Sequence, residues 1–304
     1  MPESYALSKF DDATPAEIEA ALERSDVVFF EHCPIQLPDD ADLAFLRDEL
    51  PLQTRLKNVS YHPESDSVPG LDASEGARRR VKAILKDHRA AVSTFLEKNL
   101  PDLAPGWTVG TSSFRPAEEQ GRDLKARSSN EIVHIDAGAY GATNGNRILR
   151  FFVNLNSSTD RVWGTKGSFC GLFEKHGAFA TAARGNDRRI TLRKGFADHC
   201  FTGFVSGFSK LSPKLAVLDS SPYDRAMRRI HNYMKESRDF RDDLTDYREI
   251  RFPPFSAWSV FTDGVSHSVV SGQYAFATTI LIPLKNCRTP EAAPYHILAA
   301  AAGG

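Results

Sequence analysis

The sequence has no long apolar run and no sign of an export signal. Its longest apolar stretches stay well short of the roughly 18 residues that a membrane-spanning helix needs. The opening residues, Met1-Pro2-Glu3-Ser4, lack the basic and apolar regions of a secretory signal peptide. We therefore expect a protein that has no membrane span and works in the cytoplasm.

Cysteine is scarce, and the charges nearly balance. The four cysteines include no pair with the CxxC spacing of zinc and redox motifs: Cys33, Cys170, Cys200 and Cys287. A zinc site and a disulfide framework are thus not expected, and a reducing compartment is expected. The net charge of −1 gives no overall field to attract nucleic acid or an anionic membrane. The expected partner is a small molecule, and the sequence leaves the oligomeric state open.

The chain changes character near residue 107. Residues 1–106 are mostly helical in pattern, with apolar residues at three- and four-residue steps over 75–98. Residues 107–285 carry many short β-rich runs, which are typical of a sandwich or barrel. The expected fold class is therefore mainly β with flanking helices (α+β).

Three further segments complete this outline. Residues 52–73 are polar and predict a surface loop, and residues 286–304 form a C-terminal tail. An insert at about 164–246 has helical signals and is rich in aromatic residues. These aromatic residues either line a substrate cavity or simply pack the insert against the β-rich part: Phe173, Phe179, Phe196, Phe201, Phe204 and Phe208.

The main functional signal is the pair His134 and Asp136. In a strand, residues two apart point to the same face, so this imidazole and carboxylate would leave the backbone together. With His267 from a later β-rich run, they make the 2-His-1-carboxylate set that holds Fe(II) and leaves coordination positions open. The alternative is that these residues are structural, since a single His-x-Asp also occurs by chance.

A second signal is Arg150 in the β-rich run 147–154. One face of this run carries Ile148, Arg150, Phe152 and Asn154. Burying an Arg among apolar neighbours is costly unless it meets an anion, and a guanidinium binds a carboxylate with two hydrogen bonds. Arg150 could thus hold the distal carboxylate of a dicarboxylate such as 2-oxoglutarate, or it could be a surface residue or a structural ion pair.

Four stretches together resemble the Fe(II)/2-oxoglutarate-dependent dioxygenase superfamily, and more closely the Kdo 3-hydroxylase family. They span about 107–285 and contain the motifs SFRP-x-E with GR (113–122), HIDA (134–137), RILR-x-F-x-N-x-N with RVW (147–163), and W-x-x-FTD-x-V-x-H with SGQYA (258–275). The resemblance implies a single dioxygenase domain, 1–304, with a double-stranded β-helix (jelly-roll or cupin-like) core.

The resemblance also implies a site. His134, Asp136 and His267 would bind iron and be the catalytic residues, with Arg150 binding the cosubstrate 2-oxoglutarate. Asn154 and Gln273 are further candidates for cofactor binding. The candidates on the substrate side are Arg115, Arg122, Arg161 and Trp163. The expected reaction uses O2, hydroxylates an unactivated C–H bond of a small, Kdo-like sugar acid, and releases succinate and CO2.

Two alternatives stay open. Residues 138–142, which read GAYGA, depart from the family pattern next to the predicted iron. A tailoring oxygenase for an amino acid or another natural product would keep the chemistry and change the substrate. A cupin-like binding module without catalysis would bind no iron and form no succinate.

Overall fold

The computed structural model describes residues 7–9, 13–54, 56–118, 120–121, 125–138, 141–192 and 221–303. The N-terminal part contains β1 (Leu7–Lys9), α1 (Pro15–Glu23), β2 (Val27–Phe30), α2 (Asp40–Ala44), the π-helix η1 (Phe45–Glu49), α3 (Leu50–Gln53), β3 (Val59–Tyr61) and α4 (Glu75–Asn99). Then follow β4 (Thr108–Arg115), η2 (Ala126–Ser128), β5 (Arg147–Asn154), β6 (Arg161–Thr165), α5 (Phe169–Lys175), α6 (Gly177–Arg184), α8 (Pro222–Glu236) and α9 (Arg238–Asp242). The last elements are β7 (Arg248–Phe252), β8 (Ala257–Phe261), β9 (Ser268–Ser271), β10 (Ala275–Ile282), η4 (Leu284–Asn286), η5 (Pro290–Ala292) and α10 (Pro294–Gly303).

The strands form two sheets that pack face to face. The larger sheet has the order β1-β2-β8-β5-β10-β4-β3, and the smaller has the order β7-β6-β9. Every pairing between these strands is antiparallel except β1 with β2. One buried cluster joins Phe152 and Trp258 of the larger sheet to Trp163 of the smaller one. The predicted α+β class is confirmed, with antiparallel sheets at its centre.

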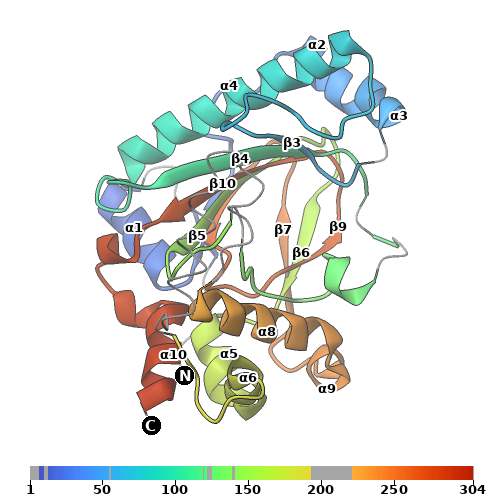
Figure 1. Cartoon of the computed structure of the whole chain (residues 1–304). Helices are drawn as coiled ribbons and strands as arrows, with labels where there is room; N and C mark the ends of the chain where they lie inside the picture. Colours follow the sequence, from blue (N-terminus) through green and yellow to red (C-terminus); the bar gives the residue numbers. More distant parts are fainter. Residues whose placement is uncertain are drawn as a thin grey trace.

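Helices of the N-terminal part cover the outer face of the larger sheet. Figure 1 shows the long helix α4 lying across the strands β3 and β4. Ser74 caps its start, since its hydroxyl accepts a hydrogen bond from the Ala77 N–H, and the helix ends at Asn99, as its periodicity predicts. Leu85 of α4 and Phe151 of β5 belong to one core. The N-terminal part also supplies β1, β2 and β3 to this sheet, so it is continuous with the β-rich part.

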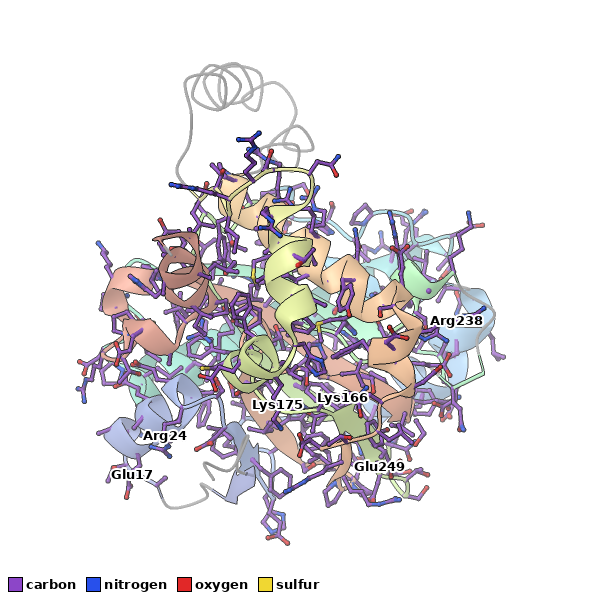
Figure 2. The ribbon with its side chains drawn as sticks, turned by 90° about the horizontal axis from the view of Figure 1, so that it is seen from below. Glu17, Arg24, Lys166, Lys175, Arg238 and Glu249 are labelled. Atoms are coloured by element: carbon purple, nitrogen blue, oxygen red, sulfur yellow. The ribbon has the colours of Figure 1, made fainter. Side chains whose placement is uncertain are left out.

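The helices of the insert gather at one end of the small sheet (Figure 1). Ser221 and Asp224 form a capping box at the start of α8, and α8 then packs with α5, α6 and α9 in a core of its own. Figure 2 shows this lower face, where Lys166 follows β6 and its ammonium donates to the carbonyls of Phe240 and Asp243 at α9. Phe179 lies fully inside the insert's core, so at this residue plain packing is the correct interpretation. Phe196, Phe201, Phe204 and Phe208 lie outside the described residues.

Two segments differ from their predicted structure. Residues 131–137 form no regular strand, and within the described part of the chain their only ladder contact is an isolated bridge between His134 and His267. Residues 52–73 are not loop throughout, because they include β3, which extends the larger sheet. None of the described helices is both long and apolar enough to cross a membrane.

Candidate metal centre

His134 and His267 lie opposite each other on neighbouring extended segments. The N–H of His134 donates to the carbonyl of His267 at 3.0 Å, and the N–H of His267 donates back at 2.8 Å. The N–H of Asp136 donates to the carbonyl of Thr262 at 2.8 Å, which holds the next part of the segment against the end of β8. Main-chain hydrogen bonds therefore set the positions of all three residues.

The segment alternates its side chains although it is not a regular strand. His134 and Asp136 line a cavity between the sheets, whereas Val133 and Ile135 belong to the core of the insert. One side of this short run therefore faces the cavity and the other packs against the insert's core. The two-residue spacing works as the sequence predicts, but the helices of the insert take the place that a neighbouring strand would have.

Both rings present the same nitrogen to the site. His134 Nδ1 is 2.7 Å from the carbonyl of Ile132, and His267 Nδ1 is 3.0 Å from the carbonyl of Val265. Because a carbonyl only accepts, each Nδ1 carries the proton and each Nε2 keeps its lone pair, an arrangement common for metal-binding histidines. One ligand atom from each of His134, Asp136 and His267 lies within 4.8 Å of the other two.

The charges favour the metal-binding form of all three residues. Burial, together with the nearby charges of His267 and Lys235, lowers the pKa of His134 well below its ordinary value. Burial also lowers the pKa of His267. Burial alone would raise the pKa of the Asp136 carboxyl, but the Arg150 guanidinium, His267, His134 and a hydrogen bond with Thr262 together outweigh this and keep that pKa below its usual range. Two neutral imidazoles and one carboxylate are a donor set that suits a divalent iron ion.

The cavity beside these residues measures about 150 Å³ and is mostly polar. Trp163 lies over the His267 ring, with centroids 5.1 Å apart and planes 25° apart. Among the described residues that line the cavity, Asp136 is the only acidic one. These residues are Asn58, Arg115, Asn130, His134, Asp136, Arg150, Phe152, Trp163, His267 and Val269. The described lining is therefore cationic and suited to anionic ligands.

Three of the predicted cofactor and substrate residues reach this cavity. Arg150 faces it from β5, on the same side as Phe152, as the alternation of 147–154 predicts. Its Nε lies 2.8 Å from Asp136 Oδ2. Arg115 and Trp163 line the same cavity from β4 and β6.

Other predicted residues form hydrogen bonds away from this cavity, and their cofactor and substrate roles stay predictions. The Asn154 amide donates to the carbonyls of Thr159, Phe252 and Pro253, so it ties loops together. Arg161 is fully buried and donates to the carbonyl of Gly272, where it supports the β9–β10 turn.

Gln273 follows in that turn, half-buried, and is not part of the cavity lining. Arg122 lies outside the described residues.

The sequence interpretation missed several residues at the site. Asn58 and Asn130 line the cavity, although neither belongs to a recognisable motif. His231 and Lys235 come from α8 of the insert. His231 Nδ1 is 2.6 Å from the carbonyl of Ile135, the residue between the two ligands of the His-x-Asp. Their spacing of four residues places both on one side of α8, but nothing in the sequence indicates that this side meets the site.

A buried ion pair supports the turn that carries His267. Arg147 Nε is 2.7 Å from Asp263 Oδ2, and Asp263 Oδ1 accepts from the N–H of Ile148 at 3.1 Å. A side chain on Gly264 would collide with Arg147, since an added Cβ would lie 2.5 Å from its Nη2. The turn between β8 and β9 is thereby joined to the start of β5.

Comparison with known proteins decides the family. The model for 3-deoxy-D-manno-oct-2-ulosonic acid (Kdo) hydroxylase matches residues 7–304. The chain belongs to this Kdo hydroxylase family. The match confirms the predicted family and the prediction that the protein is an enzyme, a hydroxylase, and it removes the cupin-like binding module as an alternative.

Solved structures of a Kdo hydroxylase, KdoO, share the fold. KdoO is described as a non-haem Fe(II) α-ketoglutarate-dependent dioxygenase. Its complex with α-ketoglutarate and Fe(III) is 24% identical to this chain in sequence, with a TM-score of 0.74, and the match covers 97% of this chain and 92% of that chain. The apo structure is 24% identical with a TM-score of 0.75, and the match covers 100% of this chain and 95% of that chain. The complex with succinate and Fe(III) is 23% identical with a TM-score of 0.76, and the match covers 99% of this chain and 97% of that chain. No curated protein matches the chain.

Proposed function

We propose that this protein is an Fe(II)- and 2-oxoglutarate-dependent oxygenase that hydroxylates a Kdo-like sugar acid. The observation that carries the proposal is the convergence of His134, Asp136 and His267 at the wall of a cationic cavity. Two neutral imidazoles and one carboxylate are the donor set of non-haem Fe(II) oxygenases. Membership of the Kdo hydroxylase family and the iron and α-ketoglutarate bound by KdoO support the same reaction.

The bound iron, with 2-oxoglutarate and O2, would supply the oxidation of an unactivated C–H bond, with release of succinate and CO2. The protein's own residues orient the reactants. Hydrogen bonds from both Nδ1 atoms to carbonyls hold the imidazoles of His134 and His267 in place. Trp163 covers one side of His267 and keeps that side apolar.

Arg150 remains our candidate for the 2-oxoglutarate carboxylate. Its guanidinium lies beside Asp136, where it lowers the pKa of that carboxyl. A metal on Asp136 would draw the carboxylate's charge to itself, and Arg150 would then be available to another anion. Arg115 lines the same cavity and carries a second positive charge for this dianion or for the substrate.

The two face-to-face antiparallel sheets support a double-stranded β-helix as the core of the fold. The N-terminal strands join the larger sheet, and this supports a single domain over residues 1–304. We also infer that the protein works in a reducing cytoplasm, since Cys33, Cys170 and Cys287 are free thiols.

An anaerobic titration with Fe(II) and 2-oxoglutarate tests the proposal. The visible charge-transfer band of the chelate should grow with wild-type protein and be absent in His134→Ala. His296→Ala, an exposed histidine on α10, serves as the matched control and should retain the band. No band with wild-type protein, or an equal band in His134→Ala, would contradict the metal assignment.

A comparison of substrates separates the sugar acid from the alternative of a tailoring oxygenase. Under O2, free Kdo, lipid-linked Kdo and a panel of amino acids are each tested for stimulation of succinate formation. Stimulation by the Kdo compounds is expected. Stimulation by an amino acid alone would change the substrate and keep the chemistry.

A further inference from the structure

A buried lysine lies close to the candidate metal centre. Lys235, one residue from the end of α8, is only 3% exposed, and its ammonium donates to the carbonyl of Arg127 at 3.2 Å. An ammonium has three donor hydrogens, and a buried charge is costly unless an opposite charge compensates it. Among the residues that the structure describes, no carboxylate forms an ion pair with Lys235.

The lysine lies on the side of α8 that meets the site. His231, four residues earlier on the same side of the helix, has its Nδ1 2.6 Å from the carbonyl of Ile135, between the two predicted ligands. The charge of Lys235 acts on both Asp136 and His134, and Lys57 is another charged neighbour. Lys57 precedes Asn58 in the sequence, and Arg127, whose carbonyl Lys235 binds, lies three residues before Asn130. Asn58 and Asn130 both line the cavity. Figure 1 shows α8 running below β6 and β9, on the side of the molecule where the short helix η2 lies.

The positive charge of Lys235 has no carboxylate assigned to it among the described residues around the cavity. Asp136, the one acidic residue in the described part of the lining, is a candidate metal ligand and already faces Arg150. Once a metal occupies Asp136, the carboxylate no longer offsets the charge of Lys235. One carboxylate of 2-oxoglutarate would bind the metal, and the other would bind the arginines on the strands. Lys235 comes from α8 of the insert and is a separate cation, outside the residues that line the cavity.

We propose that Lys235 binds the carboxylate of the sugar-acid substrate and thereby positions the sugar over the metal. This inference rests on the proposed function, and it names the residue that recognises the carboxylate of the substrate. The flexible four-carbon stem lets the ammonium keep its bond to Arg127 or turn toward an anion in the cavity. Burial lowers the pKa of Lys235 to about 8, so the ammonium is charged near neutral pH and gains stability from a bound anion.

The test compares free Kdo with its methyl ester in wild-type protein, Lys235→Met and Lys235→Arg. Met keeps the apolar stem and removes the charge, while Arg restores a cation. We expect Lys235→Met to raise the KM for free Kdo about ten- to hundredfold, the size of a lost hydrogen bond to a charged group. The methyl ester should bind equally weakly to both proteins, and Lys235→Arg should recover part of the loss.

Control readouts separate this inference from the proposed function. Lys235→Met should keep the charge-transfer band with Fe(II) and 2-oxoglutarate and should keep its KM for 2-oxoglutarate. Lys98→Met, an exposed lysine in the last turn of α4, is the matched control and should behave as wild type. If Lys235→Met fails to fold, Lys235→Gln preserves a donor to the Arg127 carbonyl and takes its place.

Two results would overturn the role of Lys235. An equal loss for free Kdo and its methyl ester would show that the lysine does not act on the carboxylate. A raised KM for 2-oxoglutarate, with that for Kdo unchanged, would assign the lysine to the cosubstrate. Absence of the band in wild-type protein would instead contradict the proposed function itself.

Discussion

The main chains of His134 and His267 are hydrogen-bonded to each other, independently of any metal. Their reciprocal N–H to carbonyl bonds, 3.0 and 2.8 Å long, form an isolated antiparallel bridge between the two segments that carry the histidines. The rings lie with centroids 4.8 Å apart and planes 45° apart. The backbone thus brings the two imidazoles together, and a metal would find these ligands already in position.

Metal binding should stabilise the fold through Asp136. At a free Fe(II) concentration of 100 times Kd, a ligand that binds only the folded protein adds about 2.7 kcal/mol. We expect anaerobic Fe(II) to raise the melting temperature of wild-type protein and to leave that of Asp136→Ala unchanged. Asp160→Ala, which removes a surface carboxylate beside Arg251, is the control. An equal rise in Asp136→Ala would exclude this carboxylate as a ligand.

Loss of Arg150 should weaken the use of 2-oxoglutarate. The guanidinium lies at the wall of the cavity, and a hydrogen bond to a charged group contributes about 1.5–3 kcal/mol. Arg150→Ala should therefore raise the KM for 2-oxoglutarate about ten- to hundredfold, measured by succinate formation. Arg251→Ala, an exposed arginine on β7, should leave it unchanged. An unaltered KM in Arg150→Ala would assign the cosubstrate to another cation.

The ion pair between Arg147 and Asp263 should matter for stability. Each residue is only 1% exposed, and removing one partner leaves a buried charge uncompensated. Asp263→Ala is expected to lower the free energy of unfolding by about 3–5 kcal/mol, measured by urea denaturation. Replacing both residues, as Arg147→Met with Asp263→Leu, should cost less. A double variant less stable than Asp263→Ala would contradict this account.

His88 should make stability depend on pH. It is 4% exposed and packs against Phe276, with ring centroids 4.3 Å apart, and neither ring nitrogen has a partner among the described residues. Burial lowers its pKa from 6.5 to about 3. The unfolded chain therefore binds the proton more tightly, so the stability contribution is present above pH 6.5 and declines as the pH falls toward 3.

His88→Leu should remove this dependence. The loss at pH 5 is about 2 kcal/mol, since each pH unit below 6.5 costs about 1.4 kcal/mol. Urea denaturation at pH 7 and pH 5 should show a smaller difference in His88→Leu than in wild type. His296→Leu on α10 is the control variant. The same difference in His88→Leu as in wild type would mean that another group causes the pH dependence.

The sequence predicted local features well where one residue's neighbours along the chain decide them. The periodicity of 75–98 predicted α4, and the alternation of 147–154 predicted that Arg150 and Phe152 share a face. It decided less where a buried polar side chain has several possible uses. Asn154 and Arg161 lie in the expected motifs, but both donate to main-chain carbonyls far along the chain. Sequence pattern does not distinguish a side chain that holds a loop from one that binds a ligand.

The sequence by itself determined the α+β class, the chemistry of the donor set and the family. Residue types and short spacings carry this information, because local hydrogen bonding and side-chain alternation act over a few residues. Only the tertiary structure decided that α8 brings His231 to the carbonyl of Ile135, 96 residues away, and brings the charge of Lys235 close enough to act on Asp136. Such contacts follow from how the insert's core packs around Val133 and Ile135, and packing between distant segments leaves no local pattern in the sequence.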